Sequence, residues 1–148
     1  MTVPVQELLP SDAAVAQRIA HLQMIRHTII TYELMSLAMK FIALAVGGSA
    51  FVLVGFGHAS EGTIKLSLIA SGVITFLLWL ADAHFRQTKW GFIALHDAAR
   101  EGRVTMFEMS PKLFKTRATF HRAVWAAPHP WLYKGISAIT LLLIFMQP

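Results

Sequence analysis

The chain has 148 residues, of which 55% are hydrophobic and only 14% charged, and its mean hydropathy is +0.55. An ordinary soluble domain has about a quarter of its residues charged, so this composition predicts one small integral membrane protein. The absence of cysteine excludes disulfides, thiolate metal sites and cysteine nucleophiles. The net charge of +5 does not indicate a nucleic-acid partner, because a membrane protein needs Lys and Arg on its cytoplasmic side.

Residues 1–33 are expected to form a cytoplasmic amphipathic helix. The stretch before Arg18 has no basic residue and no compact apolar run, so it lacks the layout of a secretory signal. Ser11 is a candidate N-cap, and helical spacing gathers apolar side chains on one face. That face comprises Val15, Ile19, Leu22, Ile25, Ile29 and Tyr32.

Two segments are apolar enough to cross a bilayer as helices. Residues 34–57 are predicted to be the first transmembrane helix, because together they exceed the ~30 Å hydrocarbon core. An external loop is expected over 58–65. Residues 66–102 are predicted to be the second transmembrane helix, extended into the cytoplasm as far as Gly102, a residue typical of helix ends.

The last third of the chain is first basic and then apolar. Residues 103–130 are predicted to form a cytoplasmic basic helix, with Ser110 and Pro111 at a typical helix start. Residues 131–148 are predicted to be a third transmembrane helix, with a re-entrant segment as the alternative. The predicted fold class is therefore all-α, an integral membrane helical bundle: a long antiparallel transmembrane hairpin with cytoplasmic helical extensions and a third short span.

The distribution of charge predicts the topology. Nine basic and three acidic residues lie between Ala83 and Lys134, whereas the connector at 58–65 has one of each. The positive-inside rule then places the N-terminus and the 83–130 segment in the cytoplasm and the connector outside. We expect a multi-pass protein of the bacterial inner (cytoplasmic) membrane.

Asp82 lies at the inner end of the second span and needs a partner there. If the hairpin turns near residue 61, residues at equal depth have numbers that sum to about 122, as Lys40 and Asp82 do, and also Glu33 and Lys89. The predicted role of these four residues is a clamp that fixes the helix register. The same register favours close helix packing at small residues, namely Gly47, Gly48 and Ser49 against Ser71 and Gly72.

A second interpretation makes Asp82 part of a conduction path. Ser67, Ser71 and Thr75 recur every four residues, and Asp82 follows near the same helix face. Hydroxyls that end at a carboxylate are typical of a water-filled pore with an acidic inner mouth. Hydroxyls in membrane helices more often pack or bond back to their own helix, so we favour the clamp and keep the conduction path as the alternative.

Two segments indicate partners. Apolar residues at alternating spacings of three and four over 78–99 resemble a heptad seam and predict self-association. The basic amphipathic stretch 110–125 suits the anionic inner leaflet of the lipid bilayer, or packing on the other cytoplasmic helices. Other membrane subunits are possible partners.

The sequence contains no recognisable catalytic, metal or cofactor motif. Its seven histidines form no pair at helical spacing and no zinc-protease pattern. Haem ligation by His27 or His84 is left open, since it needs only one axial residue. No phosphate-binding loop or nucleophile elbow is found, so we expect neither a metal nor a cofactor, and no enzyme.

The chain resembles a group of small uncharacterised bacterial membrane proteins. The likeness lies in "HLQMIRHTII", in a Lys shortly before the first span in "MSLAMKF", in "LADAHFRQTKWGF" where the second span ends, and in "FEM". The group usually has a Glu after Asp-Ala that this chain lacks, so the resemblance does not by itself imply a shared charge network. In plan the chain also resembles the two-span SLATT-type effectors of bacterial conflict systems, which implies oligomerisation and permeabilisation of the inner membrane.

Two functions follow as expectations. The first is a homo-oligomeric inner-membrane protein that forms or gates an ion-permeable pore as a defence effector. The alternative is a non-catalytic accessory or assembly subunit of a larger membrane protein complex.

Overall fold

The computed structural model describes residues 12–56, 60–104, 109–111, 119–126 and 130–146, and within these ranges every regular element is helical. The elements are α1 (Asp12–Phe56), α2 (Glu61–Arg100), α3 (Phe120–Trp125) and α4 (Pro130–Met146). The all-α prediction is confirmed. Two of the helices, α1 and α2, are long and apolar enough to cross a membrane.

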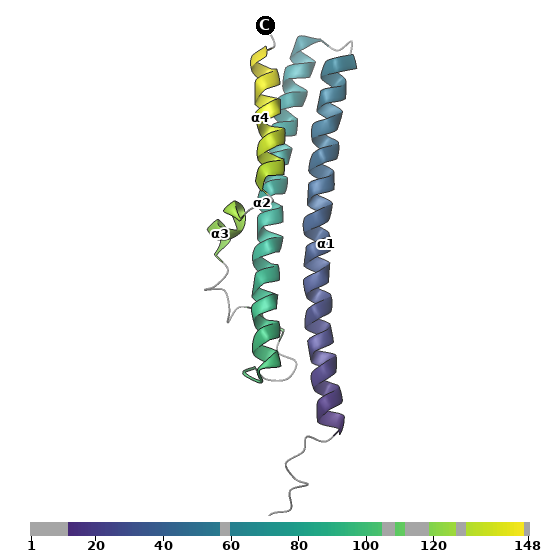
Figure 1. Ribbon diagram of the computed structural model, residues 1–148. Coiled ribbons are helices and arrows are strands. Elements are labelled where there is room, and N and C mark those ends of the chain that lie inside the picture. The colour runs from purple at the N-terminus through teal and green to yellow at the C-terminus, as the bar shows by residue number, and fades with distance from the viewer. Residues whose placement is uncertain (1–11, 57–59, 105–108, 112–118, 127–129, 147–148) are drawn as a thin grey trace, which may run out of the picture.

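The helices α1 and α2 form an antiparallel pair along most of their length (Figure 1). At 1.5 Å per residue they measure roughly 68 and 60 Å, about twice the thickness of a hydrocarbon core. Away from α4, Ile25 of α1 packs against Phe92, Leu95 and Ala99 of α2. The later part of the predicted amphipathic face, from Leu22 to Tyr32, thus packs inside the chain, whereas Val15 and Ile19 are exposed. The helix α1 continues without a break through the expected boundary at residue 33.

The connection between α1 and α2 differs from the predicted loop at 58–65. The helix α2 begins at Glu61, because Ser60 is an N-cap whose hydroxyl accepts a hydrogen bond from the Thr63 backbone N–H at 3.4 Å. Residues 57–59 lie outside the described part of the chain. The sequence signal was Ser-Glu-Gly-Thr, a cap followed by an acidic first turn, which hydropathy alone overlooks.

The other end of α2 agrees with the prediction. The helix ends at Arg100, and Gly102 adopts a positive φ of 73°. The Gly102 N–H donates to the Ala99 carbonyl at 3.1 Å, and the Arg103 N–H donates to Ala98 at 2.9 Å. Arg18 of α1 donates from Nη2 to the Arg100 carbonyl at 2.6 Å, which satisfies one more terminal acceptor.

The short helix α4 runs beside the half of the hairpin that contains the α1–α2 connection (Figure 1). Near the start of α4, Tyr133 and Ile136 pack with Ala43 of α1. The last turns of α4 pack beside Ala50 of α1 and Leu68 of α2. A Cβ on Gly47 would lie 2.9 Å from Cγ2 of Ile136, so this glycine is what lets α4 approach α1. The predicted third segment is therefore a helix; its last residues, 147–148, lie outside the described ranges.

The segment between α2 and α4 is only partly described. Residues 105–108, 112–118 and 127–129 of the expected helix 103–130 lie outside the described part. In the described part of the segment between α2 and α4, the α-helical residues are those of α3. Pro111 packs on α2 at Gly91, where a Cβ would lie 3.0 Å from the proline ring.

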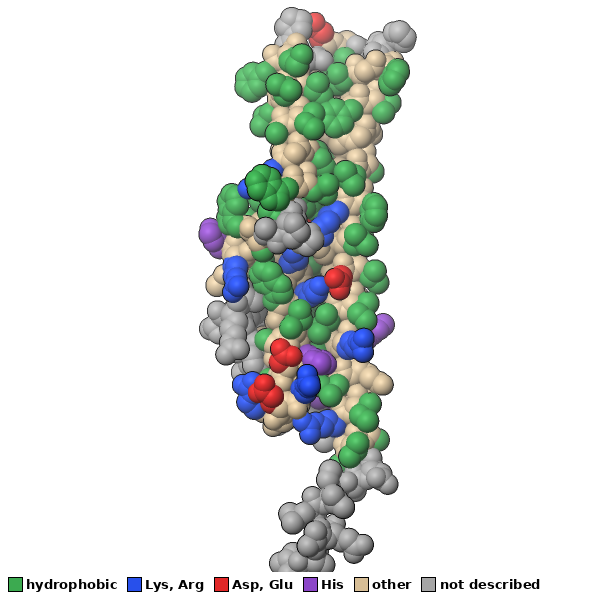
Figure 2. Space-filling model, in the orientation of Figure 1, with side chains coloured by type: hydrophobic (Ala, Val, Ile, Leu, Met, Phe, Trp, Pro, Cys, Tyr) green, Lys and Arg blue, Asp and Glu red, His purple; other side chains and the backbone are tan. Residues whose placement is uncertain are grey.

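The surface divides along the long axis into an apolar half and a charged half. Around α4 the visible face is almost all hydrophobic, and charged side chains gather over the other half, apart from an acidic group at the tip (Figure 2). Many large apolar side chains there are exposed, including Phe41 at 63%, Leu66 at 69% and Phe145 at 85%.

Candidate functional site

Asp82 is fully buried and lies at the centre of a charged cluster between α1 and α2. Its Oδ1 accepts a hydrogen bond from the Ser36 hydroxyl and lies 3.5 Å from Lys40 Nζ. Its Oδ2 lies 3.3 Å from Arg86 Nη2. Two cations and a hydroxyl stabilise a carboxylate whose burial would otherwise be costly.

Ser36 connects Lys40 to Asp82. Lys40 Nζ donates to the Ser36 hydroxyl at 2.7 Å and lies 3.3 Å from the Ser36 carbonyl, while the same hydroxyl donates to Asp82. Sequence reasoning missed this serine, because one hydroxyl in an apolar stretch has no distinctive pattern. The only signal was its spacing, since residues four apart share a helix face.

Arg86 lies one turn beyond Asp82 on α2 and is 5% exposed. Its Nη1 donates to the Ala126 carbonyl at 3.3 Å, which ties α2 to the residue after α3. Its Nε and Nη2 have no hydrogen-bond partner within the described residues, so the contact with Asp82 is an ion pair without hydrogen-bond geometry. Sequence analysis counted Arg86 only as a cytoplasmic charge, although its i, i+4 spacing from Asp82 indicated the pair.

A second ion pair lies two turns away. Lys89 Nζ is 3.0 Å from Glu33 Oε1, and the Glu33 side chain is 63% exposed. Solvent weakens such a pair to less than about 1 kcal/mol. Both pairs expected from the antiparallel register are thus present in the structure; whether they act as a clamp stays a prediction.

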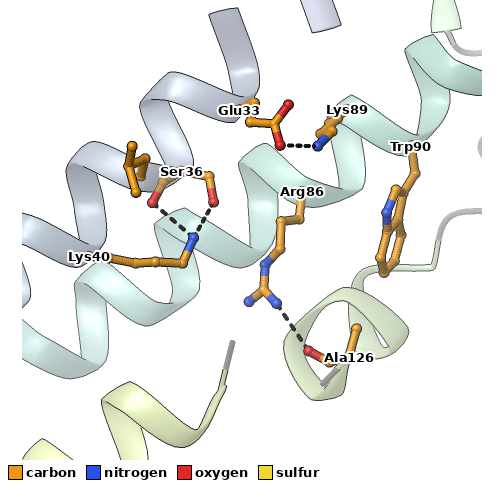
Figure 3. Close-up of a pocket in the computed structure, with 8 residues that line it drawn as sticks. Glu33, Ser36, Lys40, Arg86, Lys89, Trp90 and Ala126 are labelled. Carbon is orange, nitrogen blue, oxygen red and sulfur yellow. Dashed lines mark hydrogen bonds and ion pairs between the residues drawn. The ribbon is translucent and has the colours of Figure 1, made fainter. Parts of the chain in front are cut away.

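Beside the cluster lies a cavity of about 360 Å³. Figure 3 shows Ser36, Lys40 and Glu33 on one side of it and Arg86, Lys89 and Trp90 on the other, with Ala126 below. Leu37 completes the lining. Three cations therefore share a small space whose wall is partly apolar.

Tyr133 brings α4 to the same place. Its side chain is 1% exposed and lies within electrostatic range of Asp82 and Arg86. Its hydroxyl lies near Asp82 without completing a hydrogen bond of regular geometry among the residues that the structure describes. The helices α1, α2 and α4 therefore meet at Asp82, a convergence that the sequence did not reveal.

The predicted hydroxyl stripe faces the inside of the chain. Ser71 and Thr75 are buried, and Ser67 is half-buried. The Ser71 hydroxyl lies 3.5 Å from the Val46 carbonyl of α1, and Thr75 Oγ1 has no partner in the described part. The stripe and Asp82 are therefore covered by the chain's own helices, and their role in lining a pore stays a prediction.

The predicted small residues have different surroundings. Gly47 and Gly72 lie next to α4, where a Cβ on Gly72 would meet Thr140 at 3.8 Å. Gly48 has no atom within 4 Å of such a Cβ, and Ser49 is exposed and bonds to the Val46 carbonyl of its own helix. Gly47 and Gly72 thus accommodate α4, whereas Gly48 and Ser49 point outward.

An aromatic cluster lies close to the charged one. Lys134 Nζ lies 4.6 Å from the ring centre of Trp125 and 5.4 Å from that of Trp131. Trp79 contacts Trp125 edge-on at 5.9 Å. Tryptophan and lysine side chains gathered at one level are typical of a membrane–water interface.

Residues 78–99, predicted to self-associate, are largely used within the chain. Phe92, Leu95 and Ala99 pack on α1, and Tyr32 stacks on Phe92 at 5.7 Å between ring centres. The partner seen for this seam is therefore α1, and self-association through it stays a prediction.

The described residues contain no group of three His, Cys, Asp or Glu side chains that could hold a metal ion. His27 and His84, considered as haem ligands, are both exposed on the long helices.

Comparisons of this chain with protein-family models, with curated proteins and with solved structures found no match. The resemblances in the sequence therefore stay expectations.

Proposed function

We propose that α1, α2 and α4 cross the bacterial inner membrane, with the Asp82 cluster at the cytoplasmic boundary. The most apolar windows of α1 and α2 are only 17% and 22% buried within the chain, whereas the core helix of a soluble protein is mostly buried. So many exposed apolar side chains have to be shielded from water, and the lipid of a bilayer shields them.

The boundary is placed by charge and by aromatic residues. No charged residue lies between Leu66 and Ala81, a stretch of about 24 Å as a helix, and α4 covers about 26 Å. The aromatic cluster around Lys134 lies at the end of this apolar stretch. The excess of basic residues beyond Asp82 supports a cytoplasmic N-terminus.

Within the membrane, the protein acts as a non-catalytic subunit of an assembly. The observation that carries this is the outer face of α1, a row of exposed residues at spacings of three and four. We define it as Phe41, Leu44, Gly48 and Val52. Gly48 is open on this face, and a small residue with apolar neighbours lets a second membrane helix approach closely.

A pore is the second candidate, in the form of a homo-oligomeric defence effector. It is favoured by Thr75 Oγ1 and Asp82 Oδ2, buried polar atoms without a hydrogen-bond partner in the described chain. Such atoms inside membrane helices often mark ion pathways. We place this second because Ser71, Thr75 and Asp82 are covered, so conduction requires the helices to separate.

The test is the mass of the intact complex in mild detergent, with every co-purifying protein identified. Assembly predicts a species larger than one chain that Gly48→Leu disrupts. Gly135→Leu is the matched control, because Gly135 is equally open but lies on α4. A monomer with a normal helical spectrum would contradict assembly through this face.

Composition of the complex separates the two candidates. Other proteins in fixed stoichiometry favour the accessory subunit, whereas identical chains favour the pore. In the second case, overexpression should dissipate the membrane potential and Ser71→Leu should reduce that loss. Full retention of the potential by a correctly inserted oligomer would rule out the pore.

A further inference from the structure

We propose that the cavity between Lys40, Arg86 and Lys89 binds the phosphate of an anionic glycerophospholipid from the inner leaflet. The inference rests on the membrane placement proposed above and goes beyond it by assigning a ligand. Its basis is the charge, the hydrogen-bonding capacity and the position of the lining residues (Figure 3).

The charges do not cancel at this site. Three cations line the cavity, and two anions oppose them: Glu33 in the lining and Asp82 behind it. The balance of three positive and two negative charges leaves one positive charge. A lipid phosphate diester carries one negative charge and would neutralise it.

The donors also fit phosphate. Arg86 is almost fully buried, and its one hydrogen bond within the described chain is the long contact with Ala126. Lys89 of α2 contacts Glu33 and has an ammonium group that can make further hydrogen bonds, whereas the three donors of Lys40 on α1 already meet Ser36 and Asp82, so Lys40 contributes its charge. Guanidinium and ammonium groups that converge on one space are the usual protein ligands of phosphate.

The position favours a lipid over a soluble phosphate. The cavity includes the apolar Leu37, and Phe41 follows it one turn nearer the proposed bilayer with 63% exposure. Acyl chains of a lipid held by its phosphate would lie along this face. Basic pockets between membrane helices on the cytoplasmic side are a recognised kind of headgroup site.

The test is native mass spectrometry of the delipidated full-length protein in mild detergent, titrated with phosphatidylglycerol, phosphatidylcholine or glycerol 3-phosphate. Phosphatidylglycerol should bind more tightly than the other two. Phosphatidylcholine has the same phosphate but carries a compensating ammonium group, so its equal binding overturns the selectivity for an anionic lipid. Equal binding of glycerol 3-phosphate overturns the assignment to a lipid.

Variants give opposite expected effects. Lys89→Gln should weaken phosphatidylglycerol binding about fivefold, and Glu33→Gln should strengthen it by a similar factor, following the usual contribution of one charge near a headgroup. Arg26→Gln is the control, since it removes a positive charge from an exposed position on α1 that does not line the cavity. Identical binding by all three variants overturns the site.

Membrane association is measured separately by carbonate extraction. A protein that resists extraction but shows no lipid preference overturns the lipid site alone. A protein that carbonate releases overturns the membrane placement, and the lipid proposal with it.

Discussion

Lys40 and Asp82 are 42 positions apart in the chain, and Lys40 Nζ lies 3.5 Å from Asp82 Oδ1. The Ser36 hydroxyl lies between them as acceptor from one and donor to the other. The contact joins α1 to α2 at the end of the uncharged stretch from Leu66 to Ala81. A shift of the helices by one turn would take Asp82 away from either Ser36 or Lys40.

Asp82→Asn should therefore destabilise the protein strongly. It leaves Lys40 and Arg86 as buried or half-buried cations without their counter-charge, and loss of one partner from a buried pair costs about 3 kcal/mol or more. The measurement is thermal unfolding in detergent, followed by circular dichroism. Addition of Lys40→Met should recover part of the loss, and a loss below about 1 kcal/mol for Asp82→Asn would contradict the structural role.

Glu33→Gln should have a much smaller effect on stability. The ion pair with Lys89 is exposed on its acidic side, so its removal should change the free energy of unfolding by less than about 1 kcal/mol. The same unfolding assay at low and high salt checks this. A large, salt-independent loss would mean that Glu33 has a buried partner in the assembly.

Gly47→Ala should destabilise the docking of α4. Its Cβ would lie 2.9 Å from Cγ2 of Ile136, and overpacking of this kind costs about 1–3 kcal/mol. Gly48→Ala, one residue later, meets no atom and gains helix propensity, so its stability should be equal or slightly higher. The measurement is the unfolding midpoint of both variants side by side.

A rescue tests the cause of the Gly47 effect. Ile136→Ala removes the methyl group that the new Cβ would meet, so Gly47→Ala should cost less in that background than in the wild type. Additive losses would show that Gly47 acts through something other than its contact with α4.

Thr75→Val should stabilise the protein. Thr75 is fully buried and its hydroxyl has no hydrogen-bond partner in the described chain, so a side chain of the same shape removes an unmet polar group. The expected gain is about 1 kcal/mol in the unfolding assay. A loss of stability would instead indicate that the hydroxyl binds water or an ion inside the bundle, which would favour the pore.

Much of the architecture could be predicted from the sequence, because a charged residue in an apolar segment needs an oppositely charged partner and few residues can supply one. In an antiparallel hairpin with a known turn position, residues at equal depth have numbers with a constant sum. This relation alone pairs Lys40 with Asp82 and Glu33 with Lys89. The end of α2 at Gly102 could be predicted for a similar reason, since few residues adopt a positive φ.

The rest depended on which neighbour covers each helix face, and periodicity does not contain that information. The spacing of Ser71 and Thr75 shows that they share a face, but not that the chain's own helices bury it. Gly47 could be assigned to helix packing, but not to Ile136 of α4, which is 89 positions away. Ser36 and Tyr133 were missed because single hydroxyls leave no pattern.

The most direct test of the account is the accessibility of single cysteines, which the cysteine-free chain makes simple. Gly62→Cys lies at the tip of the hairpin and Gln23→Cys on the opposite end of α1, both at exposed positions. In spheroplasts, a membrane-impermeant maleimide should label the Gly62 variant at once and the Gln23 variant only after permeabilisation. Labelling of both in intact spheroplasts, or of Gln23 alone, would contradict a hairpin that crosses the inner membrane with Asp82 at its cytoplasmic boundary.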